Sequence, residues 1–245
     1  MKRHSLPIIA GGVQIGGGAP VSIQSMLSTP AEDFAASAAQ AKRLEAAGCE
    51  IIRAAIPNMD AVGLIPVLKE AVSVPIVADI HFDYRLALES VAAGIDKIRI
   101  NPGNIGDDSR VKQVVDACKA KNIPIRVGVN SGSLEKHILA KYGAPTAQAL
   151  VDSALYHVRL IEKFDYNQIA ISIKSSDVPT MIEAYRLAAQ QCPYALHLGV
   201  TEAGTARMGL IKSAVGIGSL LCDGIGDTIR VSLTADPVEE IAAAK

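Results

Sequence analysis

The feature that most constrains the fold is a repeat in which a short strand-like segment is followed by a helix-like segment. Because parallel neighbouring strands need a crossover between them, an unbroken order of this kind is typical of a parallel sheet. Eight such units within 245 residues predict one α/β domain, a (β/α)8 TIM barrel over residues 21–245. The strand-like segments begin near Val21, Glu50, Pro75, Lys97, Pro124, Gln168, Ala195 and Thr228.

Both ends of the chain depart from the repeat. Residues 1–20 contain two short extended pieces on either side of Gly11-Gly12, which predict a β-hairpin that plugs one end of the barrel. The last unit has a complete strand, but the helix opened by Asp236-Pro237 reaches only to Lys245. We therefore expect a truncated final helix.

Helix boundaries are indicated by capping residues. Thr29-Pro30-Ala31-Glu32 and Asp236-Pro237-Val238-Glu239 each combine an N-cap residue, a proline at the first helical position and a glutamate that closes a capping box. Thr146 and Asp177 are N-cap candidates for two other helices. Left-handed C-caps are expected where a glycine precedes the next strand, at Gly48, Gly94 and Gly224.

Composition excludes several classes of protein. The net charge of −1 argues against binding to bulk nucleic acid, and no apolar run reaches membrane-spanning length, so we expect a cytoplasmic protein. The four cysteines, Cys49, Cys118, Cys192 and Cys222, form no C-x-x-C pair. We expect buried or half-buried thiols and no metal site.

Cationic side chains recur at one alternating position of five predicted strands. Strands of a parallel sheet that helices cover are dry on both faces and should be apolar throughout. These strands instead carry Arg53, Arg99, Arg126, Lys174 and Arg230. One interpretation is that these groups only cap carboxylates and helix ends. The other is that they line a site.

Alternation places further polar side chains at the same carboxyl end of the strands, where TIM barrels carry their active sites. Five cations face two carboxylates there, and because an unpaired buried charge is costly, the arrangement calls for an anion with about two negative charges. Arginine suits two-pronged contact with phosphate, so a diphosphate or bisphosphate ligand is the hypothesis. The expected inward residues are Arg53, Asp79, His81, Arg99, Asn101, Arg126, Asn130, Lys174, Glu202, Arg230 and Ser232.

Three of these residues are candidates for chemistry. Asp79-Ile80-His81 offers two metal ligands, but two are too few, and five cations would repel a divalent ion. We therefore expect His81 to donate a hydrogen bond or carry a proton, and Glu202 to act as an acid. The other histidines, His4, His137, His157 and His197, are expected to be structural or solvent-facing.

Longer motifs show a resemblance to a known family. The chain resembles the bacterial 4-hydroxy-3-methylbut-2-enyl diphosphate synthases of the methylerythritol phosphate route to isoprenoids (terpenoids). The shared motifs span almost the whole chain, in the order Val77–Arg85, Arg99–Gly106, Gly128–Lys136, Leu198–Gly204 and Gly226–Leu233.

The resemblance implies an oxidoreductase. Family members open the ring of 2-C-methyl-D-erythritol 2,4-cyclodiphosphate with two electrons that flavodoxin or ferredoxin delivers through a 4Fe-4S cluster, and they act as homodimers. Matching positions imply that Asp79, His81 and Glu202 border the reacting carbon, with Glu202 as the proton donor. The implied diphosphate-binding residues are Arg53, Arg99, Asn101, Arg126, Asn130, Lys174, Arg230 and Ser232.

The chain also departs from the family pattern. Family members carry a carboxyl-terminal 4Fe-4S domain, which we expect to be absent here, so the 245-residue chain should bind no cluster and be inactive alone. Two alternatives remain open. One is a redox-free barrel for a phosphate ligand, such as a pterin-diphosphate transferase or a lyase with Lys174 as Schiff-base nucleophile. The other is a non-catalytic binding module.

Overall fold

The structure is a computed structural model that describes residues 2–201 and 204–245. Within those residues, eight parallel strands close into a barrel in the order β10-β3-β4-β5-β6-β7-β8-β9. The strands are β3 (Ser22–Met26), β4 (Ile51–Ala55), β5 (Ile76–Asp79), β6 (Lys97–Ile100), β7 (Ile125–Asn130), β8 (Ile169–Lys174), β9 (Ala195–Leu198) and β10 (Thr228–Ile229). The predicted TIM barrel is confirmed.

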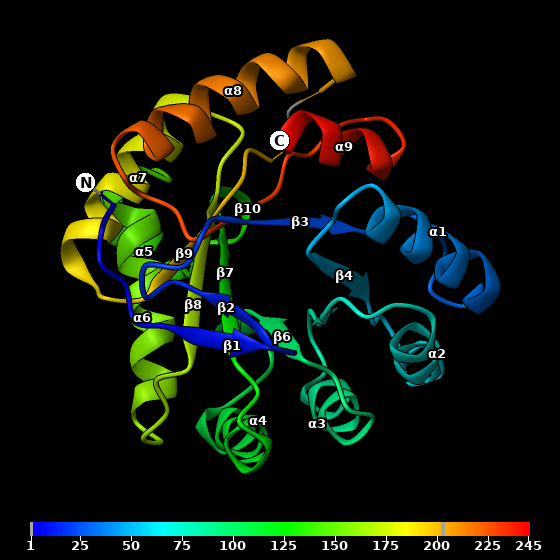
Figure 1. Cartoon of the computed structure of the whole chain (residues 1–245). Helices are drawn as coiled ribbons and strands as arrows, with labels where there is room; N and C mark the ends of the chain where they lie inside the picture. Colours follow the sequence, from blue (N-terminus) through cyan, green and yellow to red (C-terminus); the bar gives the residue numbers. More distant parts are fainter. Residues whose placement is uncertain (1, 202–203) are drawn as a thin grey trace.

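Helices surround the barrel and bury its outer surface (Figure 1). Alternate strand residues such as Ile98, Val127 and Ile171 point outward and pack against them. The helices are α1 (Phe34–Ala46), α2 (Leu64–Ala71), α3 (Tyr84–Ala92), α4 (Asp108–Lys121), α5 (Lys136–Tyr142), α6 (Ala147–Glu162), α7 (Val178–Gln191), α8 (Ala206–Cys222) and α9 (Pro237–Ala244), with 3-10 turns η1 (Asp60–Gly63), η2 (Pro102–Asn104) and η3 (Ser131–Ser133).

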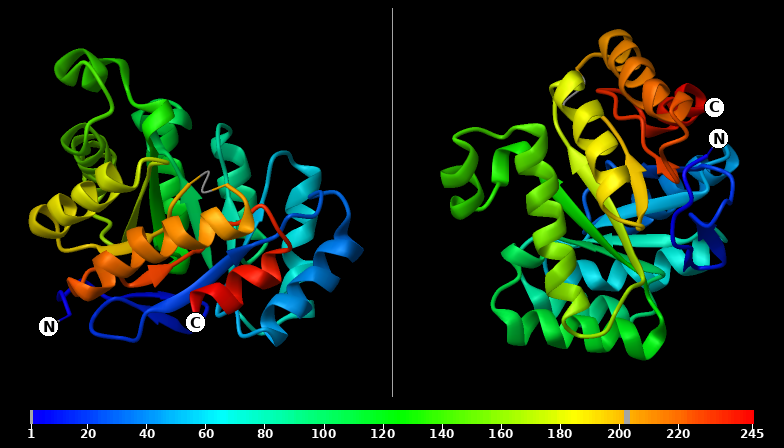
Figure 2. Two further views of the ribbon diagram at one scale, coloured as in Figure 1. Left: turned by 90° about the horizontal axis from the view of Figure 1, so that it is seen from above. Right: turned by 90° about the vertical axis from the view of Figure 1, so that its left-hand side faces the viewer.

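The predicted hairpin closes the amino end of the barrel. Strands β1 (Ile8–Ala10) and β2 (Val13–Ile15) pair antiparallel across Gly11-Gly12. Ile8, Ala10 and Ile15 pack on inward residues at the start of the barrel strands, including Ile51 and Val77. Figure 2 shows the hairpin (dark blue) and α5 (green) at opposite ends of the barrel. The carboxyl end is therefore the open end.

Most of the predicted helix caps are present. Thr146, Asp177 and Asp236 accept hydrogen bonds from the backbone N–H groups of the first turns of α6, α7 and α9. Gly48, Gly94 and Gly224 have φ of +94°, +88° and +75°, as left-handed C-caps require. The last helix, α9, covers eight residues.

The predicted cap at Thr29 is wrong. Helix α1 begins at Phe34, and Asp33 caps it by accepting a hydrogen bond from the N–H of Ala36 at 2.9 Å. The Thr29 hydroxyl instead pairs with the hydroxyl of Ser37 at 2.7 Å, which ties the preceding turn to the side of the helix. The start of α1 is therefore four residues later than predicted, at Asp33 instead of Thr29, because Thr29 contacts the side of the helix rather than its first turn.

No helix in the described part of the chain has the length and hydropathy needed to cross a bilayer.

The hairpin offers a direct test of its structural role. Ile15 is fully buried on the barrel floor, whereas Ile9, on the same hairpin, is 56% exposed. We expect Ile15→Ala to lower the free energy of unfolding by about 2–5 kcal/mol, because it leaves a cavity under the barrel. The matched control Ile9→Ala should change it by less than about 0.5 kcal/mol. Urea denaturation at neutral pH measures both, and equal effects would show that the hairpin is not part of the core.

Candidate functional site

Charged side chains from several strands converge inside the carboxyl half of the barrel. Because side chains alternate along a strand, the residues between the outward-facing isoleucines and valines must point to the axis. Arg53, Asp79, Arg99 and Arg126 lie on β4, β5, β6 and β7 and are all buried. Lys174, the last residue of β8, and Arg230, just after β10, are half-buried. The convergence predicted for these residues is present.

Asp79 is the centre of this arrangement. Its carboxylate accepts a hydrogen bond from Nη1 of Arg99 at 3.1 Å and lies 3.6 Å from Nε of Arg53. Burial alone raises the pKa of Asp79, but the two guanidinium groups outweigh it and hold the pKa well below its usual range. Gly128 makes room for the pair, because a Cβ there would collide with the Arg99 guanidinium.

Arg230 also has an acidic partner, one that sequence reasoning missed. Nη2 of Arg230 lies 3.4 Å from Oε1 of Glu240, a buried residue of α9. Glu240 in addition accepts hydrogen bonds from the Ser25 hydroxyl at 2.8 Å and the Leu233 N–H at 3.2 Å. The signal in the sequence was weak, because an acid in the first turn of a helix is common for reasons of helix capping.

Arg126 and Lys174 have no carboxylate partner among the residues that the structure describes. Nη1 of Arg126 reaches Oε1 of Gln24 at 3.5 Å, and its Nε and Nη2 have no hydrogen-bond partner in the described chain. Burial, strengthened by neighbouring arginines, lowers the pKa of both Arg126 and Lys174 well below their usual values. Burial likewise lowers the pKa of Arg53 to about 10. This part of the barrel carries uncompensated positive charge.

The remaining predicted residues lie at the rim. Asn101 is buried and accepts a hydrogen bond from the Gly103 N–H at 3.1 Å, while Asn130 and Ser232 are half-buried. The His81 side chain is 52% exposed, with Nε2 3.9 Å from Oδ2 of Asp79, so it stands at the mouth rather than inside. Glu202, the expected acid, lies outside the described residues.

Two further inward residues were missed or misjudged. Lys97 precedes Arg99 by two positions on β6 and is fully buried, so the described interior holds a sixth basic side chain. His197, expected to be structural or solvent-facing, is buried inside the barrel, where Arg126 and Lys97 act on it. The alternation that identified Arg99 also contained Lys97, and the same alternation in Ala195-Leu196-His197 would have placed the histidine inward.

The segment between β7 and α6 lies at the carboxyl end of the barrel (Figure 2), and α6 holds it through contacts to Glu135 and to α5. Glu135 accepts a hydrogen bond from the Ser153 hydroxyl at 2.7 Å and pairs with Nε2 of buried His157 at 2.5 Å. Burial raises the pKa of Glu135, but the hydrogen bonds from His157 and Ser153 outweigh it and lower the pKa to about 2. His157 is thus structural, as expected.

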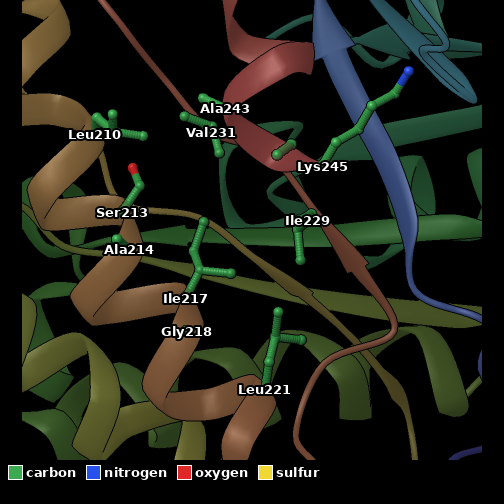
Figure 3. A pocket seen from close by; sticks show the side chains of 11 residues that line it. Leu210, Ser213, Ala214, Ile217, Gly218, Leu221, Ile229, Val231, Ala243 and Lys245 are labelled. Atoms are coloured by element: carbon green, nitrogen blue, oxygen red, sulfur yellow. The ribbon is translucent and has the colours of Figure 1, made fainter.

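Cavities elsewhere differ in character. An apolar groove between α8 and α9 is lined by residues such as Leu210, Ile217 and Val231 (Figure 3). Its charged residue, Lys245, donates to the carbonyl of Ala47. A small cavity of about 20 Å³ lies instead beside Lys174, His197, Arg230 and Ser232. The groove between α8 and α9 is thus apolar, whereas the small cavity borders residues predicted to bind the ligand.

The described residues do not fit a metal centre. Among them, no three His, Cys, Asp or Glu side chains come together in a way that could hold a metal ion. An iron–sulfur cluster needs converging thiolates, whereas Cys49 and Cys118 are buried separately, Cys192 is half-buried and Cys222 is exposed. The exposure of Cys222 corrects the expectation that all four thiols would be covered; the residue lies at the end of α8.

The central ion pair gives a stability prediction. Asp79→Asn should lower the free energy of unfolding at pH 7 by about 3–5 kcal/mol, because it leaves two buried guanidinium groups without their anion. Since folding lowers the pKa of Asp79, its contribution is present above the unfolded-state pKa and is lost as pH falls through the folded-state value. The gap between wild type and Asp79→Asn should therefore narrow below about pH 4. Urea denaturation across pH tests this, with the exposed pair Asp83–Arg85 as the control site through Asp83→Asn, which should cost less than about 1 kcal/mol. An equal loss of unfolding free energy at both sites would contradict a stabilising buried ion pair between Asp79 and the two arginines.

Comparison with solved structures shows the fold. Dihydropteroate synthase from Xanthomonas albilineans aligns over 98% of this chain and 97% of its own with a TM-score of 0.67 at 13% identity. The 3-dehydroquinate dehydratase from Geobacillus kaustophilus aligns over 100% and 98% with a TM-score of 0.65 at 15% identity. Such low identity shows a shared barrel and no shared activity.

Comparison of sequences is more specific. Curated proteins named 4-hydroxy-3-methylbut-2-en-1-yl diphosphate synthase (flavodoxin) match the whole chain. The protein from Fusobacterium nucleatum is 57% identical over 245 residues, which are 100% of this chain and 69% of the relative. The protein from Clostridium perfringens is 56% identical over 244 residues, 100% of this chain and 70% of the relative. Since the model of the GcpE TIM-barrel domain also matches residues 5–245, the chain belongs to the GcpE family.

Proposed function

We propose that this chain is the substrate-binding barrel of a 4-hydroxy-3-methylbut-2-enyl diphosphate synthase, an oxidoreductase of isoprenoid biosynthesis. Its ligand would be 2-C-methyl-D-erythritol 2,4-cyclodiphosphate, held at the open end of the barrel. The observation that carries the proposal is the excess of positive charge inside the mouth, where five cationic side chains meet two carboxylates, Asp79 and Glu240, among the described residues. A ligand with two negative charges supplies the compensation that the described protein groups do not.

Each part of the mouth has a role in this proposal. Arginine presents its N–H groups in a planar fork that matches phosphate oxygens, so Arg53, Arg99, Arg126 and Arg230 would hold the diphosphate, with Lys174 as a point charge. Asn101 already accepts the Gly103 N–H through Oδ1, so its NH2 group would be the part that donates to a ligand oxygen. Asn130 and Ser232 would add neutral hydrogen bonds at the rim.

The acid–base groups would act above the diphosphate. Asp79 is held ionised by two arginines, so it suits the orienting of neighbouring groups better than the delivery of a proton. His81 stands at the mouth beside it and can carry a proton between solvent and ligand. We propose Glu202 as the proton donor to the reacting carbon. The described residues do not fit an iron–sulfur cluster, so no step is assigned to one here.

The rest of the proposal concerns organisation. Residues 1–20 would close the floor, and residues 21–245 would form the domain that binds the cyclodiphosphate. A second copy of the protein, flavodoxin or ferredoxin as electron donor, and a cytoplasmic location complete it. Identity of 57% over the whole chain favours this function over a redox-free barrel or a non-catalytic module.

Ligand binding provides the test. Isothermal titration of the cyclodiphosphate into this chain should show binding to one site. Lys174→Met should weaken it by about 10- to 100-fold, the effect of losing one charged hydrogen bond, without lowering thermal stability. Arg85→Met, which removes an exposed cation paired with Asp83, is the control and should bind like wild type. Absence of binding to the wild-type chain, or an unchanged affinity in Lys174→Met, would refute the proposal.

A further inference from the structure

A second level of polar groups lies beneath the residues proposed to hold the diphosphate. Lys97 precedes Arg99 by two residues on β6, which places it roughly 7 Å deeper along the strand. It pairs in register with Val77, whose side chain packs on the hairpin, so Lys97 lies directly above the apolar floor. His197 occupies the corresponding inward position of β9, two residues before Gly199.

Neither side chain is compensated. Lys97 is fully buried, and its Nζ has no hydrogen-bond partner within residues 2–201 and 204–245. His197 is 2% exposed, and its Nδ1 is equally without a partner there. The nearby Tyr185 hydroxyl donates to the backbone carbonyl of His197, so this hydrogen bond gives the imidazole ring no partner. A buried base in such surroundings is most stable without its proton.

The charged groups around this level come from every side of the barrel. Arg53 on β4, Arg126 on β7 and Lys174 on β8 add positive charge, and Arg99 and Arg230 lie above. The anions nearby are Asp79 on β5, which Arg53 and Arg99 already engage, and Glu240 on α9, which engages Arg230. Burial, followed by the effect of Arg126, lowers the pKa of both Lys97 and His197 well below their usual values.

We propose that Lys97 and His197 form a proton-accepting layer, which takes protons from solvent when a doubly charged anion binds in the mouth above it. The bound anion favours the charged forms, so each accepting nitrogen gains one N–H bond and the buffer supplies the proton. The ligand named here rests on the proposed function. The layer itself depends only on the charge of the ligand.

The coupling has a defined pH dependence. Binding raises the pKa of the layer, so uptake occurs at pH values between the lowered free-state pKa and the higher bound-state pKa. Within that interval, the affinity for the anion falls as pH rises, because binding consumes protons and their concentration in solution falls. Neither the cyclodiphosphate nor inorganic sulfate changes its own charge near neutral pH, so these two ligands report only on protein groups.

The experiment is calorimetric titration of each ligand at pH 7.5 in several buffers that differ in ionisation enthalpy. For the wild-type chain we expect the observed heat to vary with the buffer, with a net uptake of up to two protons per ligand, one at each accepting nitrogen. Lys97→Met and His197→Gln should each reduce that uptake. Lys112→Met, which removes an exposed lysine of α4, is the matched control and should leave it unchanged.

A second measurement protects the test against misfolding. Because Lys97→Met replaces an uncompensated buried amine by an apolar side chain of similar shape, its thermal unfolding midpoint without ligand should equal or exceed that of wild type. A lower midpoint would show that Lys97 has a stabilising partner and would overturn the inference. The wild-type buffer series stands independently of any variant.

The remaining outcomes separate the two proposals. Heats that do not depend on the buffer would overturn the layer while leaving the proposed function intact. A proton uptake that neither Lys97→Met nor His197→Gln reduces would also overturn the layer, because another group, such as Lys174, would then accept the proton. Sulfate binding with proton uptake, but no binding of the cyclodiphosphate, would refute the proposed function and support the layer. If neither anion binds, both are refuted.

Discussion

Positive charge fixed inside a closed sheet is the constraint on which the rest of this structure depends. Strand alternation directs Arg53, Arg99 and Arg126 toward the barrel axis, opposite to the outward face whose isoleucines pack against the helices, and all three guanidinium side chains are buried. Asp79 neutralises part of this charge by engaging two of the arginines. The remainder makes the interior a place where an anion is stabilised, and every proposed role of the barrel follows from that imbalance.

Much of the fold was predictable because its signals are local. The order of strands and helices, the hairpin around Gly11-Gly12 and the caps at Thr146 and Asp177 depend on neighbours within a few residues. The cap at Thr29 failed because its hydroxyl is drawn to Ser37 by a contact that only the folded turn creates. Boundaries set by tertiary contact are invisible to a pattern of residue types.

The site shows the same division. Cations on alternating positions predicted a charged mouth, and the structure brings Arg53, Arg99 and Arg126 together around Asp79. The pairing of Arg230 with Glu240 could not be foreseen, because it joins a strand end to a helix that follows it over an irregular loop. Lys97 and His197 were within reach of the alternation argument, but only one cation was considered on each strand, and His197 was expected to be structural or solvent-facing. Every inward position along a strand, and not only one of them, indicates which side chains line the interior of the barrel.

The floor made by the hairpin has a consequence for traffic through the barrel. Ile8, Ala10 and Ile15 close the amino end of the barrel with apolar contacts, so the described residues leave solvent access to the site from the carboxyl end. Any water displaced from the guanidinium groups must leave through the same opening by which the ligand enters, and a product must leave by that opening too. A site with a single opening can admit only one ligand at a time, and a molecule bound at that opening blocks both entry and release.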